Sequence, residues 1–86
     1  MRDKKEYLTE HWEWLKEIKE DDVIMWVRAI LNNKFDEIKV GAHNRMIAGD
    51  DRFGLKTFHK SRPDIERESE EELMDFINYV YMVIKK

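Results

Sequence analysis

The 86-residue chain contains no cysteine, one proline and three glycines. The lack of cysteine excludes disulfides, thiolate zinc sites and cysteine nucleophiles, and it suits a reducing cytoplasm. Long hydrophobic runs are also missing, because the longest, Val23–Val27, is far too short to cross a bilayer. Residues 1–5 lead into charged sequence instead of an apolar signal segment. We therefore expect a cytoplasmic protein with no membrane or targeting segment.

Charge is plentiful but unevenly placed. Charged residues make up 41% of the chain and leave a net charge of −3. Residues 38–62 carry six bases against two acids, whereas residues 63–86 carry seven acids against three bases. These segments could form the two sides of a metal and phosphate site, or they could simply attract each other within one fold. The acidic last segment and the negative net charge argue against general DNA binding.

Apolar residues recur with a helical period along most of the chain, and no strand pattern is present. The sequence therefore predicts an all-α fold, a compact bundle in a single domain spanning residues 1–86. We expect about four helices, at residues 4–20, 22–32, 34–48 and 64–85.

The expected helix ends rest on capping residues. Asp21-Asp22 is predicted to separate the first two helices and to cap the second, and Asp64 to cap the last. Gly49 is predicted to follow the third helix in a left-handed conformation. Residues 49–63 are then expected to form an ordered loop. Its anchors into the core would be Phe53, Leu55 and Phe58.

The second predicted helix lacks a polar face. Every residue from Val23 to Leu31 except Arg28 is apolar, so this helix must be central in a bundle or lie at a subunit contact. A chain of this length buries only about 60–65% of its unfolded surface. We therefore predict a homo-oligomer, a symmetric dimer or a multiple of one. The candidate interface residues are Trp12, Trp26, Tyr79 and Met82.

The last predicted helix carries a stripe of carboxylates. Its members stand at positions i, i+3, i+4 and i+7, and so share one helix face: Glu68, Glu71, Glu72 and Asp75. Like charges placed together favour a nearby cation, either a divalent metal or a cluster of Arg and Lys. The stripe continues as Asn78, Tyr79 and Met82, so we expect this face to meet another helix and the acids to border a partly enclosed cleft. A negatively charged first turn, stabilised by the helix dipole, would explain Glu68 but not Asp75.

Glu71-Glu72-Leu73-Met74-Asp75, followed by Phe76-Ile77-Asn78-Tyr79, resembles the Glu-x-x-Asp helix of the all-α nucleoside-triphosphate pyrophosphohydrolases, the MazG-like group. Together with Arg52-Phe53-Gly54, Phe58 and Arg62-Pro63-Asp64, it is also similar to small phage-encoded proteins related to that group. The resemblance covers residues 45–83. It implies magnesium held by Glu-rich motifs on two neighbouring helices, with the metal positioning a triphosphate for attack by water.

The chain departs from that family pattern in one respect. The family places a Glu-x-x-Glu helix shortly before the Glu-x-x-Asp helix, but residues 38–65 contain no Glu. The pairs Glu10/Glu13 and Glu17/Glu20 lie far upstream, on the first predicted helix. A single acidic stripe would hold magnesium weakly. Within the nucleotide hypothesis, binding is therefore favoured over hydrolysis.

Two functional hypotheses are consistent with these patterns. In the first, which the patterns favour slightly, the protein binds or sequesters a phosphorylated nucleotide as a phage-encoded counter-defence protein, with Mg²⁺ on the acidic stripe. As an enzyme it would be a Mg-dependent pyrophosphohydrolase, for which no catalytic residue can be assigned. Its phosphate-binding residues would be Arg45, Arg52, Lys56, Lys60 and Arg62. In the second, it is a phage-type inhibitor or adaptor that acts in the host cytoplasm. It would then bind a host protein through its acidic and Trp- and Met-bearing helical surfaces.

Overall fold

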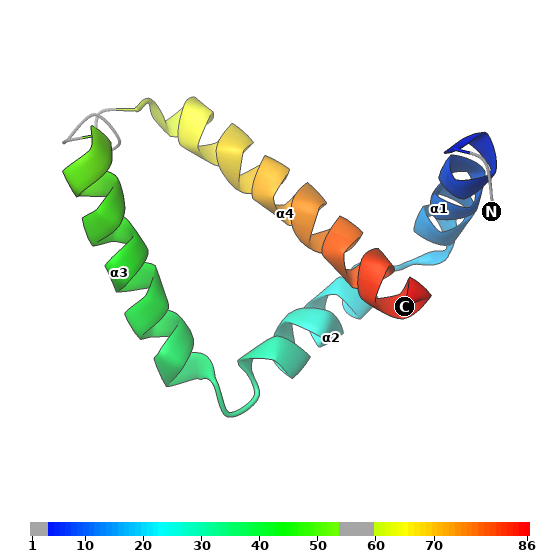
Figure 1. The fold of residues 1–86 in the computed structure, drawn as a ribbon, viewed down its shortest axis with the longest axis horizontal. Coiled ribbons are helices and arrows are strands. Elements are labelled where there is room, and N and C mark those ends of the chain that lie inside the picture. The colour runs from blue at the N-terminus through cyan, green and yellow to red at the C-terminus, as the bar shows by residue number, and fades with distance from the viewer. Residues whose placement is uncertain (1–3, 54–59) are drawn as a thin grey trace.

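A computed structural model describes the backbone of residues 4–53 and 60–86, and the side chains of residues 4–49 and 60–86. These residues form four α-helices and no strand, which confirms the predicted all-α class (Figure 1). The helices are α1 (Lys4–Glu17), α2 (Glu20–Leu31), α3 (Phe35–Phe53) and α4 (Arg62–Lys85). No helix in the described ranges is both long enough and apolar enough to span a membrane.

The break between α1 and α2 lies three residues before the predicted one. α1 ends at Glu17, and Lys19 is the N-cap of α2 with an extended backbone (φ −117°, ψ 161°). We predicted that Asp22 would cap this helix, but it is the third residue of the helix. Its Oδ2 accepts a hydrogen bond from the Lys19 backbone N–H at 2.9 Å. The aspartate still satisfies a free donor at the helix start, but it does so from inside the helix.

The predicted end of α3 at Gly49 is wrong. The helix passes through Gly49 and continues to Phe53, and Gly49 does not have a positive φ. A glycine can end a helix but does not force it to end, and no proline occurs until residue 63. The left-handed residue is instead Asn33 (φ 63°), in the short connection between α2 and α3. Two of the expected loop anchors, Leu55 and Phe58, lie outside the described residues.

α4 also begins before its predicted cap. Ser61 is the N-cap, and its Oγ accepts a hydrogen bond from the Asp64 backbone N–H at 3.3 Å. Pro63 lies in the first turn, where a missing backbone N–H costs nothing. Asp64 is thus the third helical residue, and it pairs with Arg67 at 3.4 Å.

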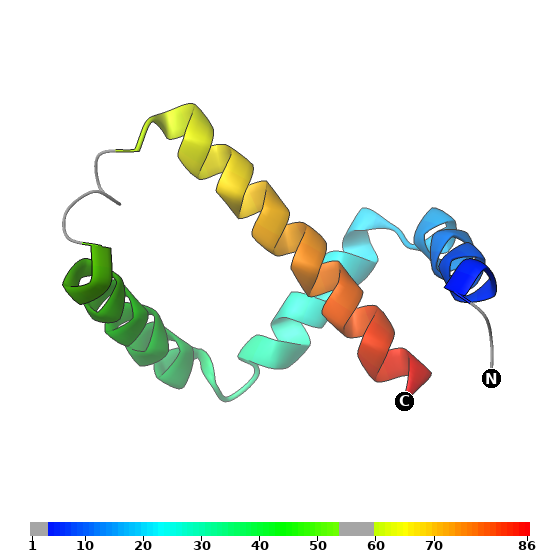
Figure 2. The same cartoon turned by 45° about the horizontal axis from the view of Figure 1, so that its top comes forward.

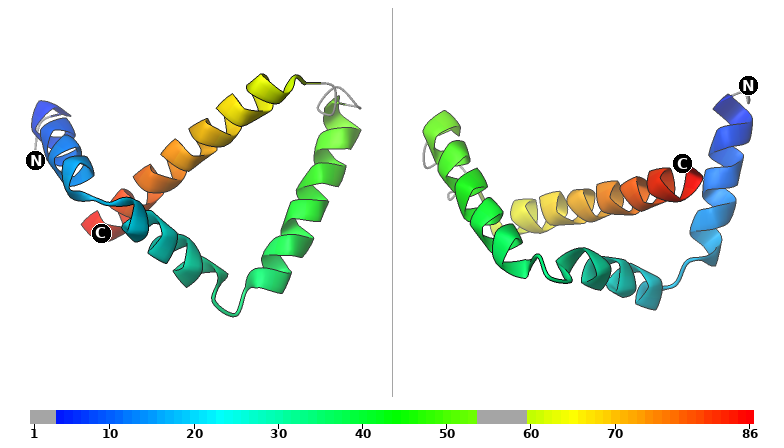
Figure 3. Two further views of the ribbon diagram at one scale, coloured as in Figure 1. Left: turned by 180° about the vertical axis from the view of Figure 1, so that it is seen from behind. Right: turned by 60° about the horizontal axis from the view of Figure 1, so that its bottom comes forward.

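The four helices form an open frame (Figures 1 and 2). α2 crosses the C-terminal half of α4, and α1 packs near the same end, whereas α3 runs away from that crossing and stands apart from α4 along most of its length (Figure 3). The radius of gyration is 16.6 Å, against about 12 Å for a compact domain of 86 residues. The compactness that we predicted is therefore not reached within one chain.

The core of a single chain is very small. Tyr81 is the only described side chain that is fully buried, at 1% exposure. It lies in the C-terminal half of α4, and Figure 3 shows α1 and α2 approaching that half of the helix. Large apolar side chains on all four helices remain exposed, including Trp12, Ile30, Met46 and Val83. One chain alone thus leaves large apolar side chains on every helix exposed to water.

Candidate functional site

An aromatic cluster holds α1 and α2 against α4. The Tyr81 ring is surrounded by three rings of α1, with centroid separations of 5.9 Å to Tyr7, 4.7 Å to His11 and 5.1 Å to Trp14. Trp14 in turn stacks on Trp26 of α2 at 5.7 Å, with only 11° between the ring planes. Aromatic pairs in this range stabilise by about 0.5–1.5 kcal/mol beyond the area that they bury. We call these five residues the Tyr81 cluster.

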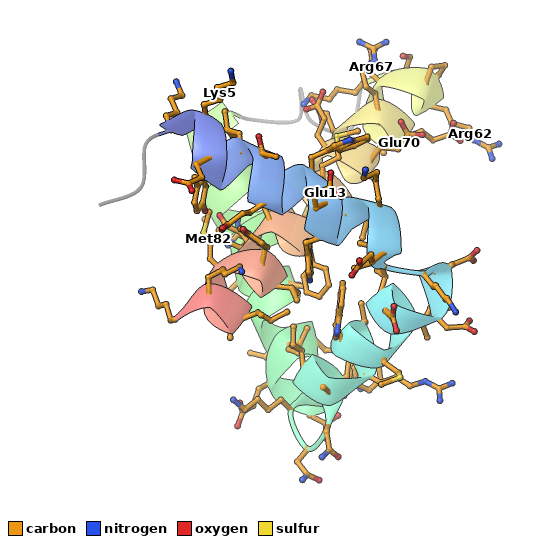
Figure 4. The ribbon with its side chains drawn as sticks, turned by 90° about the vertical axis from the view of Figure 1, so that its right-hand side faces the viewer. Lys5, Glu13, Arg62, Arg67, Glu70 and Met82 are labelled. Carbon is orange, nitrogen blue, oxygen red and sulfur yellow. The ribbon has the colours of Figure 1, made fainter. Side chains whose placement is uncertain are left out.

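A polar contact adds to this packing. His11 Nε2 donates a hydrogen bond to Asn78 Oδ1 at 3.0 Å, joining residues 67 positions apart. Met82 lines a small hollow of about 190 Å³ with Tyr7 and Leu8 of α1 (Figure 4). The C-terminal continuation of the acidic stripe therefore meets another helix at Asn78 and Met82, as predicted. Tyr79 lines an open groove that α2 borders, and its side chain remains largely exposed.

The acidic stripe itself lies on an exposed face of α4. Glu68, Glu71, Glu72 and Asp75 are all solvent-exposed, and the predicted cleft is not formed within one chain. Among the residues that the structure describes, no group of three or more acidic or histidine side chains is placed to hold a metal ion. The geometry of one chain thus gives the magnesium site no support, and that site stays a prediction.

One member of the stripe has a cationic partner. Lys60 Nζ donates to both carboxylate oxygens of Glu68, at 2.7 and 3.0 Å. A predicted phosphate ligand and a predicted metal ligand therefore pair with each other. Glu71, Glu72 and Asp75 make no ion pair with another described residue.

The other predicted phosphate ligands are scattered. Arg62 Nε donates to Glu66 Oε1 at 2.8 Å, one turn along α4, and its side chain extends outward (Figure 4). Arg45 is exposed on α3, away from the acidic stripe. The side chain of Arg52 and the whole of Lys56 lie outside the described residues. The part of the chain that is described does not gather these bases around one ligand.

The predicted interface residues fall into two groups. Trp12 and Tyr79 are exposed, at 59% and 63%, and Met82 is about half exposed. Trp26 is half-buried, because Trp14 stacks on one face of it. Its other surroundings form an open apolar groove of about 480 Å³ between α2 and α4. The groove is lined by Trp26, Ala29, Ile30, Phe76, Tyr79, Val80, Val83 and Ile84.

Two features of this region are not among the sequence predictions. Tyr81 is not among the residues predicted to be buried or at an interface, although it lies four positions after Ile77 and three before Ile84. That spacing is the available signal for a core position. The bond between His11 and Asn78 has no sequence signal, because it depends on how α1 crosses α4.

Comparison of the chain with protein-family models, curated proteins and solved structures found no match. The resemblance to the MazG-like group therefore stays a prediction that rests on the quoted motifs.

Proposed function

We propose that this chain is a small helical interaction protein, an inhibitor or adaptor, that self-associates and binds another protein through the outer face of α1. The observation that carries this proposal is Trp12, a tryptophan that is 59% exposed on a well-formed helix. Tryptophan is the side chain most enriched among residues that dominate protein–protein binding energy. Within one chain, more than half of Trp12 stays exposed to solvent.

The outer face of α1 has the composition of a binding surface. Leu8 lies one turn before Trp12, and the two line an open apolar patch together with Thr9 and the stems of Lys4 and Lys5. The inner face of the same helix already packs on the Tyr81 cluster. α1 is therefore apolar on two faces, and its own chain uses only one. The two lysines give the patch a positive edge, which suits a partner with an acidic border.

Nucleotide binding is the second candidate. It is favoured by the exposed carboxylates Glu71, Glu72 and Asp75, which make no ion pair with a described residue and so retain charge for a cation. Arg45, exposed on α3, would supply a phosphate contact only if another part of an assembly brought it to α4. No reaction step is assigned, because the described acids do not form a metal site in one chain.

The test combines partner capture with a nucleotide titration. Proteins captured by tagged wild-type chain are identified, purified and titrated against wild type, Trp12→Ala and the control Met25→Ala, which removes an equally exposed side chain from α2. We expect Trp12→Ala to weaken the direct interaction about tenfold or more, the scale of a residue that dominates an interface, and Met25→Ala to leave it unchanged.

The same preparations are titrated with nucleoside triphosphates, with and without Mg²⁺. Binding that requires Mg²⁺ and disappears in Asp75→Asn, at unchanged helix content, would replace the first candidate with the second. A purified partner that binds wild type and Trp12→Ala equally would show that the outer face of α1 is not the binding surface.

A further inference from the structure

The described chain exposes far more surface than a folded monomer of its size. Its accessible surface is 8122 Å², whereas a compact protein of 10.6 kDa exposes about 5,500 Å². The excess of about 2,600 Å² per chain would amount to about 5,200 Å² for two chains, which is at the upper end of obligate dimer interfaces. A second copy of the chain therefore accounts for the excess without any other partner.

The groove between α2 and α4 is an apolar hollow that such a copy could fill. Its walls come from two helices that cross, and nearly all of the surface that it offers is apolar. Val83 and Ile30 in its lining are 74% and 49% exposed. The α3 helix of the same chain does not cover it, because α3 leaves the far end of α2 and runs away from the crossing (Figures 1 and 3).

α3 has the complementary face. Phe35, Ile38, Ala42 and Met46 recur at helical spacing and form one apolar stripe, and all four are exposed. An apolar stripe of this kind gains nothing while it is exposed to water. An apolar helix face is the kind of surface that binds in an apolar groove.

The charges beside the α3 stripe and beside the groove are of opposite sign. On α4 the groove residue Tyr79 continues the face of Glu72 and Asp75, so a helix lying along this face meets carboxylates at one end and apolar side chains at the other. On α3 the stripe is flanked by Arg45, and by Lys39, which pairs with Asp36 at 3.1 Å. Arg45 therefore gives this apolar helix a basic edge that suits the acidic edge of the groove.

From these observations we propose that α3 of a second copy occupies the α2–α4 groove, and that the two chains exchange this contact reciprocally. The inference rests on the self-association proposed above and adds the surfaces that carry it. In such a dimer Arg45 of one chain lies on the acidic stripe of the other. The charges that stand apart within one chain are then brought together by the partner.

Three single variants test the contact by light scattering and sedimentation. Val83→Glu places a charge in the groove and Met46→Glu places one on the α3 stripe, both at side chains at least half exposed in one chain. Val40→Glu is the matched control, because Val40 is 61% exposed on the opposite side of α3. We expect wild type and Val40→Glu at twice 10.6 kDa, and the other two variants at 10.6 kDa with unchanged helix content.

Disulfide trapping then identifies the occupant, since the chain has no cysteine of its own. Chains with Val83→Cys are mixed with chains carrying Phe35→Cys or Met46→Cys, one at each end of the stripe, and oxidised. Since Arg45 on the acidic stripe directs the Met46 end of α3 toward Asp75, we expect a mixed disulfide with Phe35→Cys and none with Val40→Cys. A dimer that survives both Glu variants, or a mixture that traps neither end, overturns the α3 contact while self-association stands. A wild-type chain that stays monomeric at micromolar concentration overturns both.

Discussion

At the scale of single residues, Tyr81 carries an unusual share of the packing. Three rings of α1 contact it, and Trp14 extends the contact to α2 through Trp26. No other described side chain is fully buried. Because protein interiors are close-packed, removal of this ring would leave a void between α1 and α4.

We therefore expect Tyr81→Ala to lower the free energy of unfolding by about 3–5 kcal/mol, as for other buried aromatic side chains. Urea denaturation followed by far-UV circular dichroism measures the change. Trp12→Ala, which removes an even larger but exposed ring, serves as the control and should cost less than about 1 kcal/mol. Equal losses in the two variants would mean that Tyr81 is not the centre of the core.

At the scale of secondary-structure elements, the short connection between α2 and α3 sets the direction of α3. Asn33 has a φ of 63° there, a conformation that asparagine tolerates better than most residues and that β-branched residues resist. Asn32, next to it, has an ordinary φ of −57°. Position 33 therefore needs a residue that tolerates a positive φ, whereas the adjacent position 32 does not.

This difference gives a matched prediction. Asn33→Val should destabilise the protein by about 1–2 kcal/mol, the cost of a left-handed conformation for a side chain with a branched Cβ, and Asn33→Gly should not. Asn32→Val should have a much smaller effect. Chemical denaturation of the three variants provides the comparison, and a loss for Asn32→Val as large as that for Asn33→Val would exclude the backbone explanation.

The helices were predictable from the sequence because apolar residues recur with the helical period. The residues at which the helices begin and end were not predictable in the same way. Gly49 is compatible with both the end and the interior of a helix, and the residues after it decide between the two. Asp22 satisfies a free donor at the start of α2 from the third position of the helix, whereas at the start of α4 Ser61 accepts from the backbone N–H of Asp64. Both aspartates lie three residues after the N-cap, so they marked each start to within three residues. The pairing of Lys60 with Glu68 could not be anticipated either, because it needs the chain entering α4 to turn back along the helix.

The candidate site was harder to predict than the fold for a related reason. The stripe from Glu68 to Asp75 can be deduced from helical spacing alone, but its exposure cannot. Whether such acids border a cleft depends on the helix that lies beside them. In one chain α3 stands away from them, and that arrangement is a property of the whole molecule.

At the scale of the whole molecule, stability should depend on protein concentration. If the excess surface of each chain is buried by another, the folded state is favoured by mass action, and the melting temperature rises as the protein becomes more concentrated. Thermal melts from about 1 to 100 µM, followed by circular dichroism, measure this shift. A melting temperature that stays constant over that range would indicate a chain that folds alone.

The bond between His11 and Asn78 also has a consequence for biosynthesis. Its two residues are separated by 67 positions, and ribosomes add about 5–20 residues per second, so α1 is made roughly 3–13 s before the segment that it packs on. During that interval Trp14 can already stack on Trp26 of α2, but Tyr7 and His11 lack their native contacts on α4. Closing so long a loop is entropically slow, so the association of α1 with α4 is expected to be a late event in folding.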